Sequence, residues 1–213
     1  DRYSQSELQT RIFQDPNAND ISSLYMDDGY LFFQVTPVEK AVEGDSIDLD
    51  INIYEGAQAT IDKVIISGNT KTNEHVIRRE IRSYPGTKFS RSDIIRTTRE
   101  IANLGYFDPE KTEVNPIPNP SKGTVDIEYK VSEKPADQLE LSAGWGGTGV
   151  IGTVGVSFNN FSARNLFKKE AWNPIPSGDG QRLSFRLQST GKAFQSINAS
   201  FTEPWLGGKK PNA

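Results

Sequence analysis

The residues that could do chemistry are few in this sequence of 213 residues. It contains no cysteine and a single histidine, His75. This composition excludes thiolate zinc sites, cysteine nucleophiles and multi-histidine metal centres. His75 lies near the start of a predicted helix, without a second histidine or a nucleophile beside it, so we expect a surface or capping role. We therefore expect no metal, no cofactor and no enzymatic activity.

Pairs of neighbouring carboxylates are the next candidates, because such pairs can bind Ca²⁺ or perform acid–base catalysis. The pairs are Asp27 with Asp28, Asp48 with Asp50, and Asp108 with Glu110. An EF-hand needs a denser series of oxygen ligands and a glycine at a fixed position, which none of these pairs has. We therefore interpret them as residues of solvated strand faces and turns.

A series of basic residues falls on and around two predicted helices: Arg78, Arg79, Arg82, Lys88, Arg91, Arg96 and Arg99. The formal net charge of the sequence is −4, so we expect no binding to nucleic acid. The series predicts either a solvated helix face or a docking surface for an acidic partner. The docking surface would consist of Arg78, Arg79, Arg82, Arg96 and Arg99.

Two α+β segments position these residues. In the first, helices are predicted at 4–13 and 20–28, ending near Gly29, and strands at 30–38 and 47–54. In the second, a strand from residue 59 is followed by a helix that includes residues 76–81. Another helix begins at Ser90, which Asp93 complements as in a capping box, and ends at Gly105. Extended chain is predicted at 106–117, and a strand at 125–131.

The two segments match as an internal repeat of about 76 residues. Leu24, Gly29, Tyr30, Glu55 and Gly56 correspond to Leu104, Gly105, Tyr106, Glu133 and Lys134. Two unrelated α+β units with a common turn are the alternative. The chain opens inside a predicted helix, so we expect a fragment of a mature protein. Residues 1–57 would form a βααββ unit without its first strand, and residues 58–135 a complete one.

Residues 136–213 have a different pattern, in which apolar and polar residues alternate along four predicted strands at 138–147, 150–158, 182–188 and 196–201. Short turns at 146–149 and 190–192 join the strands, and a longer connection spans 159–180. No apolar run is long enough for a membrane-spanning helix. A soluble sheet would need a second layer that the chain does not supply, so we predict transmembrane strands. Four strands cannot close a barrel, and we expect the others beyond Ala213.

Together these features resemble the superfamily of outer-membrane insertases and transporters built from polypeptide-transport-associated (POTRA) domains and a barrel. The fold class is then α+β POTRA repeats followed by antiparallel transmembrane β-barrel strands, an incomplete barrel. Within the superfamily the sequence is most similar to BamA-like β-barrel assembly factors, with two-partner-secretion and TamA-like transporters as alternatives. The long 161–179 connection departs from the usual pattern. The matching features are residues 64–69 and 77–81, the Gly105-Tyr106-Phe107 step, Val125 to Ile127 with Val131 and Glu133, and residues 202–205.

The resemblance implies a function in folding and inserting outer-membrane proteins, without nucleotide hydrolysis. Implied partners are unfolded outer-membrane proteins, periplasmic chaperones, accessory lipoproteins and outer-membrane lipid. The first barrel strand would pair with client strands through its backbone at a lateral seam. Gly144 interrupts that strand, as glycine does where pairing is weak. The predicted pairing residues are Leu139, Leu141, Ser142, Gly144 and Trp145.

A second pairing edge is predicted in the segment that follows Gly105. Pro109 and Pro116 indicate that this segment is at the edge of its sheet, because proline cannot donate to a central ladder. Clients or chaperones would add a strand there. The predicted contact residues are Tyr106, Phe107, Glu113 and Val114. A soluble periplasmic interaction module is the remaining alternative for the whole chain.

Overall fold

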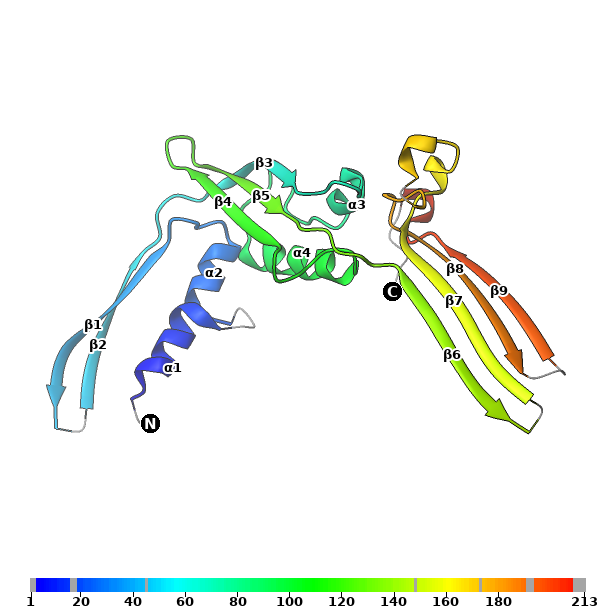
Figure 1. Ribbon diagram of the computed structural model, residues 1–213. Helices are drawn as coiled ribbons and strands as arrows, with labels where there is room; N and C mark the ends of the chain where they lie inside the picture. The colour runs from blue at the N-terminus through cyan, green and yellow to red at the C-terminus, as the bar shows by residue number, and fades with distance from the viewer. Residues whose placement is uncertain are drawn as a thin grey trace. The chain divides into compact units, whose positions relative to one another are not determined.

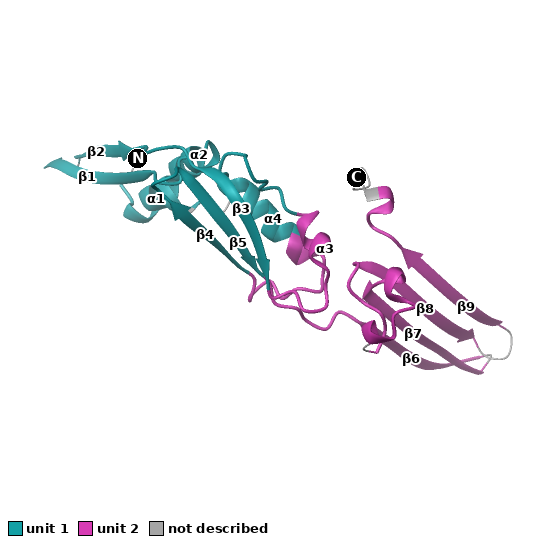
Figure 2. Cartoon of the chain, turned by 90° about the horizontal axis from the view of Figure 1, so that it is seen from above, with its two compact units in different colours: residues 1–67, 81–100, 113–130 teal, residues 68–80, 101–112, 131–213 magenta. Residues whose placement is uncertain are grey.

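The computed structural model describes residues 3–15, 19–44, 46–147, 149–172, 174–190 and 194–208. The chain forms two compact units that alternate along the sequence (Figure 2). Unit 1 comprises residues 1–67, 81–100 and 113–130, and unit 2 comprises residues 68–80, 101–112 and 131–213. In the described part of the chain, we find no helix with the length and apolar character needed to span a membrane.

Unit 1 begins with two short helices and a hairpin. Helix α1 (Gln5–Gln9) continues into a π-helical turn (Thr10–Gln14), and α2 (Ile21–Asp27) follows. Strands β1 (Gln34–Glu43) and β2 (Ser46–Tyr54) pair antiparallel. Their small core contains Ile12, Phe33 and Val35, and the ring of Tyr25 stacks on Phe33 with the centroids 4.3 Å apart. The predicted strand at 30–38 therefore begins late, because residues 30–33 turn the Phe33 ring into this core.

A three-stranded sheet completes unit 1. Strand β5 (Thr124–Lys130) lies in the middle, parallel to β3 (Thr60–Ser67) and antiparallel to β4 (Glu113–Asn119). Helix α4 (Arg91–Asn103) lies beside the sheet in Figures 1 and 2. The predicted cap is confirmed, since Ser90 Oγ accepts a hydrogen bond from the Asp93 amide at 3.2 Å. Alternate β5 side chains, Val125, Ile127 and Tyr129, are fully buried.

Carboxylates from the first helical segment hold the start of α4. Asp27 accepts a hydrogen bond from the Ser92 amide at 2.7 Å, and Asp28 pairs with Lys88 at 2.9 Å. The pair Asp27 and Asp28 thus joins the end of the first helical segment to the start of α4. Within the described ranges no cluster of three or more potential metal ligands occurs.

Unit 2 contains the four predicted alternating strands. They are β6 (Gln138–Gly146), β7 (Gly149–Phe161), β8 (Gln181–Thr190) and β9 (Phe194–Thr202), antiparallel and adjacent in chain order. The β7–β8 connection contains 3₁₀ turns at Ala163–Asn165 and Lys169–Ala171, and another at Leu206–Gly208 follows β9. Of the predicted turns, residues 148, 191 and 192 lie outside the described residues.

Two boundaries predicted from the sequence are wrong. The helix predicted around residues 76–81 is only one turn long, α3 (Glu74–Arg78). The segment predicted as extended from residue 106 becomes a strand only at Glu113. Before that, Asp108 begins a turn in which its carbonyl accepts from the Lys111 amide at 3.3 Å. Tyr106 and Phe107 precede this turn and are buried, with 4% and 0% of their surface exposed.

Two glycines follow the helices in the positive-φ conformation predicted for them, Gly29 with φ 94° and Gly105 with φ 84°. Another, Gly68 (φ 89°), is additionally constrained by its neighbours. A Cβ atom on Gly68 would lie 1.9 Å from the carbonyl oxygen of Val131, whereas one on Gly105 would meet no atom within 4 Å. At position 105 the positive φ is the one reason for glycine. At position 68 the close approach of the Val131 backbone is a second reason.

This contrast predicts unequal costs for the same substitution. Gly105→Ala should reduce the free energy of unfolding by about 1 kcal/mol, the cost of a positive φ. Gly68→Ala should cost about 3 kcal/mol or more, because two backbone segments must separate. Urea unfolding of the detergent-solubilised protein, followed by circular dichroism, measures both values. Equal losses would contradict the close approach of Gly68 to Val131.

Candidate functional site

Strand β6 is the candidate site because it is an edge strand of its sheet, as β9 also is, and is the strand at which the sequence predicts a lateral seam. It pairs with β7 from Gln138 opposite Ser157 to Gly146 opposite Gly149, and in the described structure no strand lies on its other side. Side chains from Gln138 to Trp145 are all exposed. The N–H and C=O groups along this side, hereafter the free edge of β6, can pair with another strand.

The four-stranded sheet has one apolar and one polar face. Most of the large side chains of the apolar face are exposed: Leu139 and Leu141 by 67%, and Leu187 and Phe201 by about half. Val156, on the same face, is half-buried. The aromatic residue Trp145 is 85% exposed, near the turn into β7. No second layer covers this face within the described residues, as the sequence predicts.

An ion pair crosses the polar face from β6 to β8. Arg186 of β8 donates to Glu140 of β6 at 2.6 Å, above Gly155 of the intervening strand. A Cβ atom on Gly155 would lie 3.3 Å from the Glu140 carboxylate, so glycine leaves room for the pair. Sequence reasoning missed this arrangement. The signal was present in opposite charges on one face of two strands, with a glycine between them.

Gly144 has open space around it. It lies opposite Ile151 of β7, and a Cβ atom on it would meet no described atom within 4 Å. Close approach of another segment does not explain the glycine in this structure. Its remaining physical effect is to weaken the strand, since glycine offers no side chain for cross-strand packing.

The second predicted edge is only partly placed as expected. Glu113 and Val114 lie in β4, which is an edge strand of the order β3-β5-β4 and contains Pro116. The prediction that Tyr106 and Phe107 belong to this pairing edge is wrong, because they lie outside β4 and their rings are buried. Burial raises the pKa of Tyr106. The nearby Arg79 guanidinium acts in the opposite direction, because its positive charge favours the ionised phenolate, but burial outweighs it. Neither ring is available to a partner strand.

The predicted basic docking residues have different surroundings. Arg78 pairs with Glu74, and Arg82 pairs with Glu100 at 2.7 Å. The prediction that Arg79 belongs to a docking surface is wrong, because its side chain is only 14% exposed and lies over the Trp205 ring, 5.3 Å from the centroid. It therefore stabilises unit 2 rather than presenting charge to solvent. Arg96 and Arg99 are exposed on α4.

The start of β6 is fixed by Glu133, five residues upstream. Its carboxylate accepts hydrogen bonds from Thr70 Oγ1 at 2.5 Å and from the Thr72 amide at 2.6 Å, with the Lys71 amide adding a third partner. Burial of the carboxylate acts to raise its pKa, but these hydrogen bonds outweigh burial and lower the pKa below its ordinary value. The ionised form thus holds loop 70–72 against the segment that leads into β6.

The β7–β8 connection binds the same loop from its other side. Asp179, 5% exposed, accepts from Asn73 Nδ2 at 2.8 Å and from Ser162 Oγ at 2.6 Å. Asn160 donates to Thr72 Oγ1 at 2.8 Å. His75 lies 3.5 Å from Asp179 and is half-exposed, which agrees with its predicted surface position. Sequence reasoning missed this network, because its members are distant in sequence.

The chain is similar in sequence to known proteins. Residues 59–134 match the POTRA family, "Surface antigen variable number repeat". The outer membrane protein assembly factor BamA of Neisseria meningitidis serogroup B is 30% identical over 84% of this chain and 20% of its own length. BamA of Neorickettsia risticii is 32% identical over 81% of this chain and 21% of its own length. The chain thus spans about a fifth of these relatives.

A solved structure supports the same fold. The crystal structure of BamA from Haemophilus ducreyi lacking POTRA domains 1–3 superimposes with a TM-score of 0.76. The match covers 97% of this chain and 35% of that chain, at 21% sequence identity. The similarity extends over both compact units, so the predicted resemblance to POTRA-plus-barrel proteins is confirmed.

The Glu133 contacts predict a pH-dependent stability. A carboxylate whose pKa is lowered by folding stabilises the protein above its ordinary pKa, and this stabilisation disappears as the pH falls through the lowered value. Glu133→Gln should cost about 1–3 kcal/mol at pH 7. The difference from wild type should shrink below about pH 4. Thermal unfolding across this range measures it.

Glu113→Gln is the matched control, since among the described residues the Glu113 side chain forms an exposed pair with Lys130 at 3.3 Å. Its effect should stay below about 1 kcal/mol. A Glu133→Gln difference that persisted undiminished at pH 3 would contradict the role assigned to the ionised carboxylate.

Proposed function

The chain is BamA-like, with a POTRA domain at residues 59–134, and from this premise we propose that the parent protein folds and inserts β-barrel proteins into the outer membrane. The protein is located in the outer membrane of a Gram-negative bacterium, with its POTRA domains in the periplasm. Its clients are unfolded outer-membrane proteins, delivered by chaperones and handled with accessory lipoproteins. The process uses strand pairing and requires no nucleotide hydrolysis.

Strands β6–β9 are the first strands of the transmembrane barrel in this proposal. Their apolar face is exposed at Leu141, Leu187 and Phe201, where lipid would supply the missing contacts. Strands of nine to thirteen residues suit a tilted crossing of the hydrocarbon layer. The polar face, with the Glu140–Arg186 pair, would line the barrel interior. Residues 136–213 then form the barrel portion, after POTRA domains at 1–57 and 58–135.

The observation that carries the proposal is that β6 is both an edge strand and the first strand of its sheet, the position at which the final strand of a closed barrel would meet it. A client strand cannot enter lipid with unpaired N–H and C=O groups, since each would cost several kcal/mol. The free edge offers backbone partners to such a strand, and backbone pairing accepts many client sequences. Client strands would therefore add at Leu139, Leu141, Ser142, Gly144 and Trp145. Gly144 eases separation of the seam between β6 and the final barrel strand.

Other surfaces of the chain would act before insertion. The β4 edge at Glu113 and Val114 would receive clients or chaperones in the periplasm by strand addition. The exposed basic residues Arg96 and Arg99, with Arg78 and Arg82 partly neutralised by their own partners, would dock an acidic accessory subunit.

The assignment of the apolar face to lipid predicts that arginine costs more stability at Leu187 than at the adjacent Gln188. Leu187→Arg should destabilise the barrel by about 2–4 kcal/mol near the bilayer midplane, because arginine would face hydrocarbon. Gln188→Arg, on the polar face, should cost less than about 1 kcal/mol. Reversible unfolding of the full-length protein in vesicles measures both. Equal costs would contradict the assignment of the apolar face to lipid.

The seam predicts a reversible inhibition. A disulfide between Ser142→Cys and a cysteine on the final strand of the full-length barrel should block insertion by closing the free edge. Insertion of a model barrel protein into liposomes is measured with the lock oxidised and again after reduction, which should restore it. Each single-cysteine variant serves as control.

Undiminished insertion with the lock closed would contradict strand templating at β6. It would instead favour transport through the barrel interior, as expected of a two-partner-secretion or TamA-like transporter.

A further inference from the structure

The β7–β8 connection has an exposed apolar and basic segment at residues 164–172, hereafter the connection tip. Phe167 is 92% exposed, Trp172 50% and Leu166 41%. Arg164, Lys168 and Lys169 are also exposed, and none of the three forms an ion pair within the described residues. Glu170 is the one acidic residue of the tip. Such a combination of unpaired cations and exposed aromatic rings indicates an interaction surface.

The tip is held in a defined conformation. Ser162 Oγ caps its first turn by accepting from the Asn165 amide at 3.2 Å, and Trp172 Nε1 donates to the Leu166 carbonyl at 3.1 Å. Isolated β-bridges join Phe161 to Ser177 and Trp172 to Pro176. Polar groups of the connection thus turn inward while Phe167 stays in solvent. The fixed exposure of Phe167 favours a binding role over a flexible loop.

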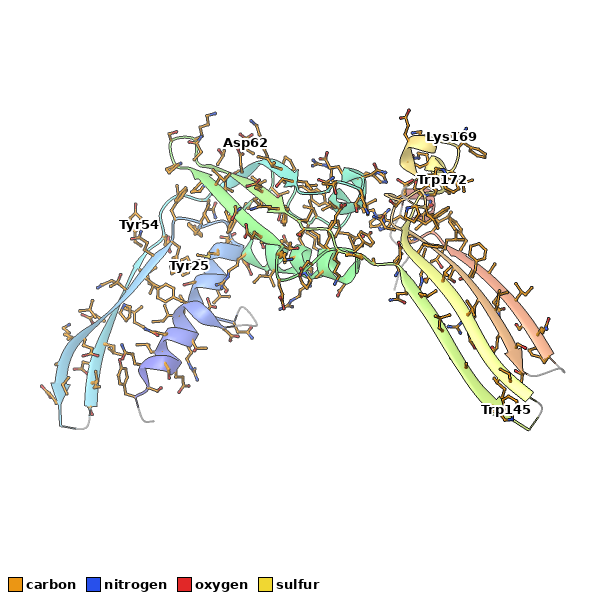
Figure 3. The ribbon with its side chains drawn as sticks, viewed as in Figure 1. Tyr25, Tyr54, Asp62, Trp145, Lys169 and Trp172 are labelled. Carbon is orange, nitrogen blue, oxygen red and sulfur yellow. The ribbon has the colours of Figure 1, made fainter. Side chains whose placement is uncertain are left out.

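The location of the tip identifies its environment. It begins three residues after β7 ends, and Figure 3 shows Lys169 and Trp172 at the end of the sheet opposite Trp145. Strands of this length, tilted in a barrel, cross an apolar band about 25 Å tall. The tip therefore begins where the hydrocarbon ends. Tryptophan and basic residues are characteristic of that interface, since rings sit at the headgroup level and cations meet lipid phosphates.

We propose that the connection tip is a lipid-binding anchor in the periplasm-facing headgroup layer of the outer membrane. Phe167 and Trp172 enter the layer, and Arg164, Lys168 and Lys169 bind lipid phosphates. A soluble phosphate would satisfy the cations but not the aromatic rings, which commits the site to a membrane surface. The inference rests on the proposed function, because it requires that β6–β9 cross the membrane.

The anchor has a consequence for the rest of unit 2. The connection binds Asn73 through Asp179, and Asn160, at the end of β7, binds Thr72. Fixing the tip at the headgroups therefore also fixes the depth of this loop, and with it the start of β6. The tip acts as a positioning element for the free edge.

The depth of Phe167 is measured with an environment-sensitive fluorophore. The sequence contains no cysteine, so Phe167→Cys gives one labelling site in this part of the protein, and any cysteine elsewhere in the full-length protein is replaced by serine. The labelled full-length protein is reconstituted in phosphatidylcholine vesicles containing phosphatidylglycerol and brominated acyl chains, which quench on contact. Leu141→Cys is the label for the sheet, and Ser121→Cys, in an exposed POTRA turn, is the negative control.

We expect quenching at positions 167 and 141 and none at 121. Quenching at 141 without quenching at 167 would overturn the anchor while leaving the membrane-spanning sheet intact. Absence of quenching at both would overturn the proposed membrane location of the sheet itself. A label at 167 that becomes protected only when accessory proteins are added would assign the tip to a protein partner and overturn the lipid anchor.

The cations are tested in the same assay. Lys168→Gln with Lys169→Gln should lower quenching at position 167 about twofold in vesicles containing phosphatidylglycerol. Lys63→Gln with Lys122→Gln removes the same charge from exposed positions in unit 1 and should leave quenching unchanged. Equal quenching in the two double variants would overturn the assignment of Lys168 and Lys169 to lipid phosphates.

Discussion

The pairing of backbone hydrogen-bonding groups is the constraint on which this structure depends. A strand in hydrocarbon must pair both edges, because no water is present to satisfy its N–H and C=O groups. Strand β6 pairs one edge with β7 and leaves the other free in the described structure. In the proposed membrane location, the alternation of apolar and polar residues would serve this constraint, since it would let one face meet lipid while the ladder stays intact.

Contacts at the base of the sheet place the free edge. Glu133 binds loop 70–72 shortly before β6 begins, and Asn160 of β7 and Asp179 of the β7–β8 connection bind the same region. On the polar face, Glu140 reaches Arg186 across Gly155, which links β6 to the second strand beyond it. These contacts attach β6 to the sheet on one side, which the proposed templating requires if the other side exchanges partners.

Much of this architecture could be predicted from the sequence, because the positive-φ glycines and the four alternating strands depend on local patterns. Predictions failed where tertiary contacts override local preference. Tyr106 and Phe107 continue an extended pattern, yet burial of both rings and the turn at Asp108 remove them from β4. Arg79 belongs to the basic series, but its side chain is largely shielded from solvent and lies over the Trp205 ring. The network around Asp179 joins residues about 100 positions apart, and no local pattern predicts such contacts.

The most direct test is to map the register between β6 and a client strand during insertion. Cysteines at Ser142→Cys and, separately, at Gly144→Cys in the full-length protein are cross-linked to cysteines scanned along the terminal strand of a stalled client. Strand templating predicts one preferred client position for each, and a shift of two client residues between them. Cross-links without a preferred client position, or found only at a residue of an inner strand such as Gln188→Cys of β8, would contradict templating at the free edge of β6.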